Sequence, residues 1–316
     1  MRICLLAPTY MDLYCPIVEE LERQGHQVTF VEDKMFDFDW KYPYRSFFDR
    51  LIRKIDCVIN RRFENYWNGV FSARCDLNQH FDELIVVNGC SFHKSFLRRI
   101  KFYNKKIKTV LYLWDNSSFY DYFHYNELFD KVMTYDINDS EKYAVKLLPF
   151  YWQQSQCVGG IKDKYKLSMI GSNHSGRLQI ARSVSSQLKK QGYPYYIKVL
   201  DGCLKEDEII INHAIPLMDV LNIIMESECV LDTDRASQTG TTPRLIWALA
   251  MGKKVITTNL NIKRMPLYHP DRISFIDRNN PVLDNKFLAL KIDQKEQISY
   301  LSSLRCNYSV KAVLCA

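Results

Sequence analysis

The strongest constraint on the fold is an alternation of short apolar runs with helical stretches, which begins at the first residues. Arg2–Leu6 is an apolar run, Pro16–Gln24 has helical spacing and is followed by Gly25, and Gln27–Val31 is a second run. Alternation of this kind predicts a parallel sheet covered by helices on both faces. The other runs of the first half are Asp56–Ile59, Leu84–Val87, Thr109–Leu113 and Lys131–Thr134, with a helical stretch at Phe92–Phe102.

The same alternation starts again in the second half of the chain. A strand is predicted at Leu167–Ile170, a helix at Leu178–Lys190 and a strand at Tyr196–Leu200, while residues 151–164 lack periodicity and are interpreted as a linker. We therefore predict an α/β protein of two doubly wound Rossmann-like domains, residues 1–150 and 165–316, facing a central cleft. The remaining predicted elements are a helix at Leu217–Met225, a strand at Cys229–Leu231, a helix at Pro243–Met251 and a strand at Lys254–Thr257.

The positive charge of the chain is concentrated in its second half. The net charge is +7, from 43 basic and 36 acidic residues. Residues 1–150 hold 21 of each, which leaves 22 basic and 15 acidic residues beyond them. This asymmetry favours an anionic ligand on the second domain. Zinc-finger spacing, an RRM signature and a basic-region heptad are all missing from the sequence, so nucleic acid is not the expected partner.

The cysteines and the apolar runs indicate where the protein works. The ten cysteines include no C-x-x-C pair, and we interpret them as reduced core residues. No apolar run approaches the roughly 18 residues of a spanning helix, and the first residues lack the apolar region of a signal peptide. We therefore expect a cytoplasmic protein.

The segment from Asp232 to Asn259 carries the clearest chemical signal. After the strand that ends at Leu231, a polar loop leads to Pro243, with Thr241 and Thr242 as candidate helix caps. Free N–H groups at such a helix start, with hydroxyl groups and Arg244, would bind a diphosphate. An ordinary strand-to-helix loop with an N-cap and a surface arginine is the alternative.

The residues of this segment resemble a known family. The pattern Gln-x-Gly-x-Thr-x-Arg, followed by Ala-Leu-x-x-Gly-Lys-Lys-Val-Ile-Thr-Thr-Asn, resembles the donor-binding segment of bacterial capsular and lipopolysaccharide glycosyltransferases with the GT-B fold. The resemblance implies transfer of a sugar from a nucleotide-sugar donor to a glycan or lipid-linked saccharide acceptor. It extends less sharply to Met169–Arg177 and Leu111–Asp115. The matching residues are Gln238, Gly240, Thr242, Arg244, Ala248, Leu249, Gly252, Lys253 and Asn259.

One position departs from the family pattern. Many GT-B enzymes have a glutamate near the start of this helix that binds the donor ribose, and Trp247 stands at the similar place here. An indole cannot accept a hydrogen bond, so Asp232 or Asp234 would have to hold the ribose, or the nucleotide would be bound differently. We interpret Trp247 as a packing residue.

A second candidate phosphate loop follows the first strand of the second domain. Its residues Gly171, Ser172, His174 and Arg177 offer close backbone approach and donors for phosphate oxygens, although a plain turn is the alternative. Together with Gln238, Gly240, Thr241, Thr242 and Arg244 they form the predicted donor site. Arg177 and Arg244 would neutralise charge on the leaving diphosphate, so no cofactor and no divalent metal are expected. Metal binding by Asp232 and Asp234 is the less favoured alternative.

Candidate catalytic groups lie in the first half. Asp12 follows the first strand and is the preferred base for removing a proton from the acceptor hydroxyl, with His93 and Asp115 as rivals. Each of the three could instead be a helix cap or a loop hydrogen bonder. If the enzyme retains configuration, the donor phosphate itself could remove the proton.

Two stretches mix cations with aromatic residues. Lys94–Lys108 has seven basic residues and no acidic one, and Trp40–Lys54 is similar in character. Both suit an anionic membrane surface, and both are equally well explained by a core helix with a solvated basic face.

Two other functions remain open on the sequence alone. A nucleotide-sugar epimerase of the same double fold would turn over the donor without a glycan partner. A non-catalytic sugar-nucleotide-binding subunit of a polysaccharide assembly complex would bind the donor without transfer.

Overall fold

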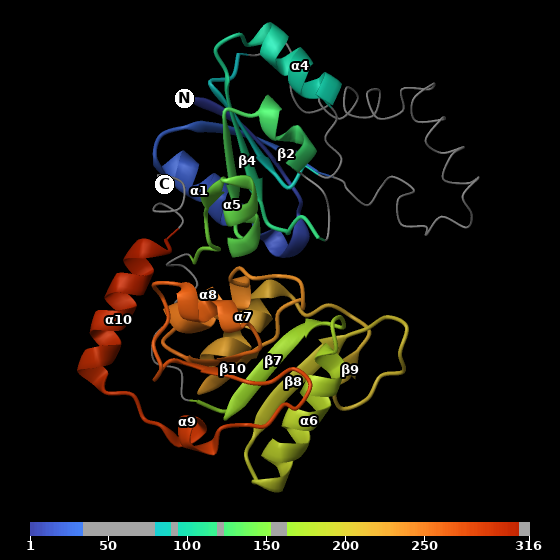
Figure 1. Cartoon of the computed structure of the whole chain (residues 1–316), viewed down its shortest axis with the longest axis vertical. Coiled ribbons are helices and arrows are strands. Elements are labelled where there is room, and N and C mark those ends of the chain that lie inside the picture. The colour runs from blue at the N-terminus through green and yellow to red at the C-terminus, as the bar shows by residue number, and fades with distance from the viewer. Residues whose placement is uncertain (34–79, 90–93, 119–122, 153–162, 310–316) are drawn as a thin grey trace. The chain divides into compact units, whose positions relative to one another are not determined.

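The chain folds into two compact units, each built on its own sheet. The computed structural model describes residues 1–33, 80–89, 94–118, 123–152 and 163–309 (Figure 1). One unit comprises Met1–Tyr135 and Asp139–Leu147, and the other comprises Asp136–Asn138 and Leu148–Ala316. The predicted strand at Asp56–Ile59, the stretch Trp40–Lys54 and His93 lie outside the described residues. Within the described ranges, no helix has both the length and the apolar character needed to cross a membrane.

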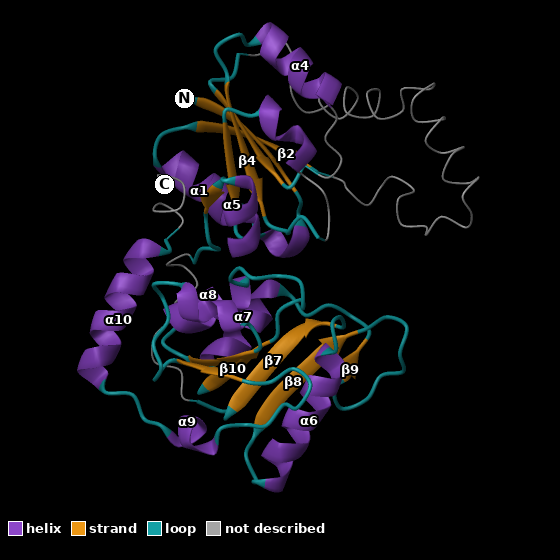
Figure 2. Cartoon of the chain, in the orientation of Figure 1, coloured by secondary structure: helices purple, strands orange, loops and turns teal. Residues whose placement is uncertain are grey.

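The first unit has a parallel six-stranded sheet in the order β2-β1-β3-β4-β5-β6. Figure 2 draws its strands in orange. Its central strand β1 is buried on both faces, since Ile3 to Ala7 are all 0% exposed. Alternate strand residues such as Leu6 and Val86 pack against Leu97 and Ile100 of the helix α4. The strands are β1 (Arg2–Ala7), β2 (Gln27–Glu32), β3 (Glu83–Val87), β4 (Lys108–Leu113), β5 (Lys131–Thr134) and β6 (Lys146–Leu147). The helices are η1 (Tyr10–Asp12), α1 (Cys15–Arg23), α4 (Lys94–Tyr103), η3 (Phe123–Leu128) and α5 (Ile137–Tyr143).

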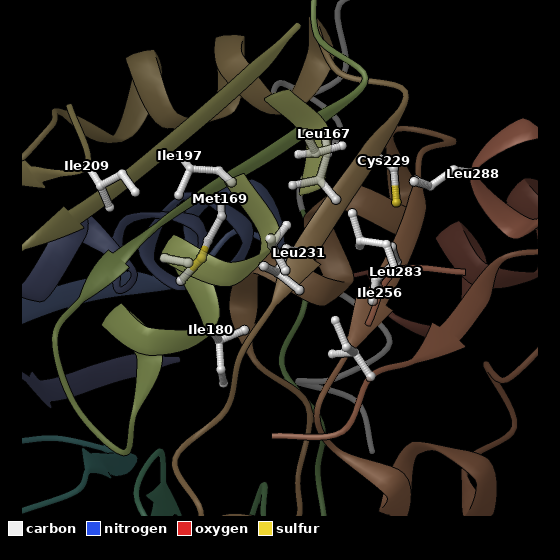
Figure 3. Packing of buried hydrophobic residues seen from close by; sticks show 14 of the residues in the cluster. Leu167, Met169, Ile180, Ile197, Ile209, Cys229, Leu231, Ile256, Leu283 and Leu288 are labelled. Atoms are coloured by element: carbon white, nitrogen blue, oxygen red, sulfur yellow. The ribbon is translucent and has the colours of Figure 1, made fainter. Parts of the chain in front are cut away.

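The second unit has a parallel six-stranded sheet in the order β12-β11-β10-β7-β8-β9. Helix α6 covers one face through Ile180, Ala181, Val184 and Leu188, whose spacing makes an apolar stripe, and Figure 3 shows this core. The strands are β7 (Leu167–Ser172), β8 (Tyr195–Leu200), β9 (Ile210–Ile211), β10 (Cys229–Asp232), β11 (Lys254–Thr257) and β12 (Ile273–Phe275). The helices are α6 (Arg177–Lys190), α7 (Leu217–Met225), α8 (Pro243–Ala250), η5 (Leu260–Arg264), α9 (Asn285–Ala289) and α10 (Gln294–Asn307).

The strand orders fix where each unit can hold a ligand. In the first sheet the chain passes from β1 to β2 on one side and then to β3 on the other, so the connections change direction between β1 and β3. In the second sheet the same change occurs between β7 and β10. Ligands of doubly wound sheets bind beyond the carboxyl ends of the strands at such switch points. The two doubly wound sheets predicted from the sequence are therefore confirmed, and each has one switch point.

Candidate functional site

Strands β7 and β10 are the two strands at the switch point of the second sheet, and they pair only briefly. The pair in register between them is Val230 with Ser168. Beyond it, toward the carboxyl ends of both strands, the carbonyl groups of Ile170 and Ser172 accept hydrogen bonds from arginine side chains. Guanidinium groups therefore take the place of sheet hydrogen bonds at this point.

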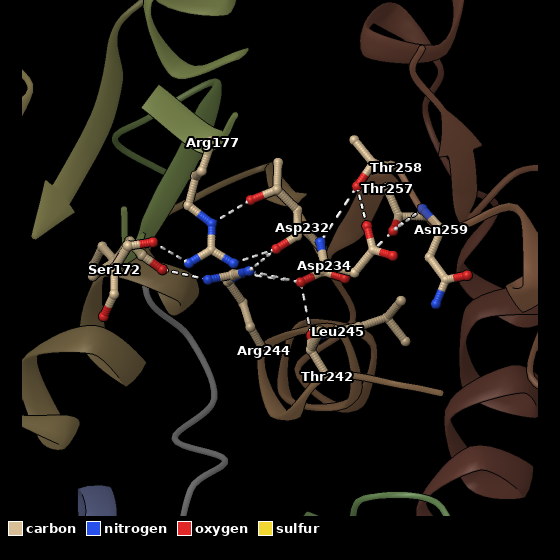
Figure 4. Close-up of polar contacts among 12 residues, drawn as sticks. Ser172, Arg177, Asp232, Asp234, Thr242, Arg244, Leu245, Thr257, Thr258 and Asn259 are labelled. Atoms are coloured by element: carbon tan, nitrogen blue, oxygen red, sulfur yellow. Dashed lines mark hydrogen bonds and ion pairs between the residues drawn. The ribbon is translucent and has the colours of Figure 1, made fainter. Parts of the chain in front are cut away.

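Arg244 is one of these two arginines, and it lies in the first turn of α8 (Figure 4). Its Nε and Nη2 donate to Oδ1 of Asp232 at 3.1 and 2.9 Å. Its Nη1 donates to the carbonyl of Ile170, and its side chain is only 12% exposed. The surface arginine of the alternative interpretation is therefore not observed, because the side chain turns inward to pair with the strand ends.

Arg177, at the start of α6, is the second arginine and is 6% exposed. Its Nε donates to Oγ1 of Thr233 at 2.6 Å, its Nη1 to the carbonyl of Ser172 at 2.6 Å, and its Nη2 to the carbonyl of Thr233. Gly171 lies against both arginines, and a Cβ at this position would be 2.6 Å from Nη1 of Arg177 and 3.0 Å from Nη1 of Arg244. Any side chain at Gly171 would therefore have to displace a guanidinium group.

His174 has a strongly lowered pKa. Burial is the largest cause, and together with the charges of Arg177, Arg235, Arg244 and Arg278 it lowers the pKa of the imidazole from 6.5 to about 3. Its Nδ1 is buried and has no hydrogen-bond partner in the described part of the chain. His174 is therefore neutral at physiological pH, and the loops around it carry a concentrated positive charge.

Arg278 enters this cluster from the segment after β12 and was not predicted. Its Nη2 donates to Oδ1 of Asp234 at 2.5 Å and to Oγ1 of Thr258 at 3.1 Å, and its Nη1 donates to the carbonyl of Ser175 at 2.8 Å. Burial raises the pKa of the Asp234 carboxyl, and the charge of Arg278 opposes that shift. No local pattern around Arg278 could have identified it, because only the strand order brings it to the switch point.

Arg235 was also missed, although a signal existed. It lies in the polar loop that the sequence singled out, between β10 and α8, and it is half-buried. A basic residue in a loop already assigned to phosphate binding was the available signal.

The two aspartates of the loop have their oxygens engaged. Oδ1 of Asp232 accepts from Arg244 and, at 2.7 Å, from Oγ1 of Thr242, while its Oδ2 lies 3.4 Å from Oγ1 of Thr257. Asp234 pairs with Arg278 and accepts from Thr258. Both carboxylates thus serve as counter-ions to arginines.

The start of α8 is capped as predicted. Thr242 is the N-cap, and its Oγ1 accepts from the N–H of Leu245 at 3.1 Å, while Pro243 occupies the first helical position. The helix is buried from Leu245 to Ala250, and Trp247 is 4% exposed, which confirms the packing interpretation of Trp247.

The other predicted loop residues lie around this cap. Thr241 is 0% exposed, and its Oγ1 accepts from the N–H of Phe150 at 3.3 Å. The carbonyl of Gly240 accepts from Nδ2 of Asn259 at 2.9 Å, and the N–H of Gln238 donates to the carbonyl of Arg235 at 2.9 Å. Thr241 and Gly240 therefore shape the loop from within, whereas Gln238 is half-exposed.

At the switch point of the first sheet, the loop after β1 adopts an unusual backbone. Met11 and Asp12 have φ of 50° and 51°, in the left-handed region that side chains rarely adopt, and Asp12 is exposed. Asn88, after β3, has φ of 59°, and its Nδ2 donates to Oδ2 of Asp115 at 3.1 Å. Strained residues of this kind cluster at functional sites. Asp12 follows β1, which is at the switch point, and Asp115 follows β4, which is the neighbour of β3.

Comparison with solved structures identifies the fold. The lipopolysaccharide outer core galactosyltransferase WaaB matches with a TM-score of 0.54 at 10% identity, over 99% of this chain and 97% of that one. The chain has the GT-B fold. Sucrose-phosphate synthase of Thermosynechococcus elongatus matches with a TM-score of 0.53 at 9% identity, over 100% and 94% of the two chains. HepE of Anabaena in complex with UDP-glucose matches with a TM-score of 0.51 at 9% identity, over 99% and 97%.

At the level of sequence, no family model and no curated protein matches this chain. The GT-B fold is therefore established by structural similarity. Within that fold, the arginine cluster lies at the switch point of the second of the two sheets.

Proposed function

We propose that this chain is a glycosyltransferase that uses a nucleotide-sugar donor. The observation that carries the proposal is the meeting of three arginines at the switch point of the second sheet, where Arg244 donates to the carbonyl of Ile170, Arg177 to that of Ser172 and Arg278 to that of Ser175. Asp232 pairs with Arg244, and Asp234 pairs with Arg278. A cluster of arginines at a switch point suits an anionic ligand, and a nucleoside diphosphate is such a ligand.

The arginines have different tasks in this proposal. Arg177 and Arg244 hold the diverging ends of β7 and β10 and supply positive potential from fixed positions. Arg235 and the imidazole of His174 contact the diphosphate. Charge that develops on the diphosphate as the sugar leaves meets cations already in place, which is why we expect no divalent metal to be required.

The acceptor would bind at the first unit. Asp12 is exposed beyond the carboxyl end of β1, where it can take a proton from an acceptor hydroxyl. Asp115, which accepts from Asn88, is better placed to fix the loop, and His93 stays a candidate from the sequence alone. We expect the acceptor to be a glycan or lipid-linked saccharide of surface polysaccharide or lipopolysaccharide synthesis, modified in the cytoplasm.

UDP is the first nucleotide to test, because the HepE structure of the same fold contains UDP-glucose. Replacing Arg177 or Arg244 would also disturb the ends of β7 and β10, so the residue to replace is Arg235, in the loop between β10 and α8. A charge-assisted contact contributes about 1.5–3 kcal/mol, so Arg235→Ala should raise the UDP dissociation constant about 10- to 100-fold in calorimetry.

Arg182→Ala is the matched control, since Arg182 lies on α6, is 53% exposed and pairs with Asp207 at 2.7 Å. Its UDP affinity should equal that of the wild type. Equal affinities for the two variants, or no nucleoside diphosphate binding by the wild type, would contradict the proposal. Donor turnover without a glycan would indicate an epimerase, and binding without any turnover would indicate a non-catalytic subunit.

A further inference from the structure

Helix α4 of the first unit carries an unusual combination of side chains. Leu97 and Ile100 are 1% and 3% exposed and fix its inner face against the sheet. The sequence from Lys94 to Lys108 contains seven lysines and arginines and no acidic residue. A helix that only needed a solvated outer face would tolerate carboxylates there, so their absence calls for a physical reason.

Two aromatic residues at the end of α4 point into solvent. Phe102 is 72% exposed and Tyr103 is 47% exposed, and their rings meet edge to face with centroids 5.4 Å apart. Neither ring contributes to the buried core of the unit. Exposed aromatic rings flanked by cations are typical of segments that lie in the headgroup region of a bilayer.

The end of α4 is fixed by hydrogen bonds, so the two rings stay exposed. Asn104 is 3% exposed, and its N–H donates to the carbonyl of Ile100 at 2.8 Å. Its Oδ1 accepts from the N–H of Phe81 at 2.8 Å, and its carbonyl accepts from the N–H of Ile107 at 3.0 Å. The last turn of the helix is therefore anchored to the core and cannot rotate the rings inward.

The cations beside the rings are available for a partner. Arg98, Lys105 and Lys106 are exposed, and none of them forms an ion pair with a carboxylate of the described ranges. Lys101 differs, since its Nζ donates to the carbonyl of Leu128 at 2.7 Å and lies 3.7 Å from Asp130. We call Arg98, Phe102, Tyr103, Lys105 and Lys106 the α4 surface.

We propose that the α4 surface docks the protein on an anionic lipid bilayer. The rings would enter the headgroup region, and the three cations would contact lipid phosphates. The turn at Lys105 and Lys106 leads into the start of β4, so the surface lies at the amino edge of the sheet. Asp12 and Asp115 follow strands at the opposite, carboxyl edge. Docking would therefore leave that edge uncovered, and the proposal does not depend on which reaction the protein catalyses.

The test is flotation of the full-length protein with two kinds of vesicle. Wild type should bind vesicles of phosphatidylcholine mixed with phosphatidylglycerol, and should bind phosphatidylcholine vesicles weakly. Lys105→Gln with Lys106→Gln should lower the affinity for the mixed vesicles by about fivefold per lysine. Phe102→Ser with Tyr103→Ser should lower it by about tenfold or more, because apolar burial is lost.

Matched controls separate docking from general effects. Lys189→Gln with Lys190→Gln makes the same charge change on α6, and Ile298→Ser removes an apolar side chain that is 70% exposed on α10. Both should bind the mixed vesicles as wild type does. The proposal is overturned if the α4 variants bind the mixed vesicles as tightly as the controls do, or if wild type binds both kinds of vesicle equally. Binding of an RNA or DNA duplex without binding of either vesicle would also overturn it. UDP affinity should be unchanged in every variant. A negative result in the vesicle test would therefore not contradict the proposed donor site.

Discussion

The unexpected property of His174 in the proposed donor site is its lowered pKa, which keeps the imidazole neutral. Its Nδ1 is buried without a described partner, and burial with the four arginines holds its pKa at about 3. A diphosphate in this position would offset the arginine charges and make the protonated imidazole more favourable. His174 is therefore the group whose protonation should report on the state of the site.

The pH dependence of stability follows from the direction of this shift. The pKa of His174 is about 3 in the folded protein against an ordinary value of 6.5. Between these values the unfolded chain binds a proton that the folded chain does not, so His174 destabilises the fold progressively as pH falls below 6.5. His174→Gln should remove this contribution, and urea unfolding across that pH window should then show a shallower loss of stability than wild type. A parallel pH dependence of the two proteins would contradict the assignment.

At the scale of elements, the decisive feature is the divergence of β7 and β10. Only Ser168 and Val230 are in register, and the carbonyls beyond them accept from Arg177 and Arg244. Buried carbonyl groups need partners, so the arginines stabilise a gap that would otherwise leave strand ends unsatisfied. The same arrangement holds two positive charges at the switch point.

Gly171 tests this arrangement. A Cβ on Gly171 would lie 2.6 Å from Nη1 of Arg177, and both guanidinium groups are fixed by carbonyls. Gly171→Ala should therefore lower the free energy of unfolding by about 1–3 kcal/mol, and should weaken UDP binding in calorimetry. Gly202→Ala is the control, because its Cβ would have nothing within 4 Å. Equal stability of the two variants would show that the guanidinium groups move aside freely.

At the scale of the whole molecule, the two units divide the proposed reaction. The arginine cluster belongs to the second unit, while Asp12 belongs to the first. Donor affinity and turnover should therefore respond to different substitutions.

Asp12→Asn keeps the shape of the side chain but removes the proposed base. UDP affinity should stay at the wild-type value, while transfer to an acceptor should fall by about 100- to 10,000-fold. Glu22→Gln, on the exposed side of α1, makes the same charge change and should transfer normally. Normal transfer by Asp12→Asn would move the role of base to another group.

Much of this architecture follows from local sequence signals. The apolar runs predicted β5 and β11 with their observed bounds, and most other predicted elements differ from the observed ones by one or two residues. Thr242 as N-cap and Pro243 at the first helical position could also be identified, because capping involves only neighbouring residues. Several short elements, such as β6, β9 and β12, were missed, since two or three residues carry no periodic signal.

The composition of the proposed donor site was decided by the tertiary structure. The sequence identified two loops, but the order of the strands places β7 beside β10 and so joins Arg177 to Thr233 and Arg244 to Ile170. It also brings Arg278 to Asp234 from the segment after β12. Propensities, caps and turns act over a few residues, whereas burial and ion pairing depend on which strands become neighbours. For that reason the sequence determined the elements and the charge of the second half, and only the fold determined that Arg244 points inward and that Arg177, Arg244 and Arg278 meet at the switch point.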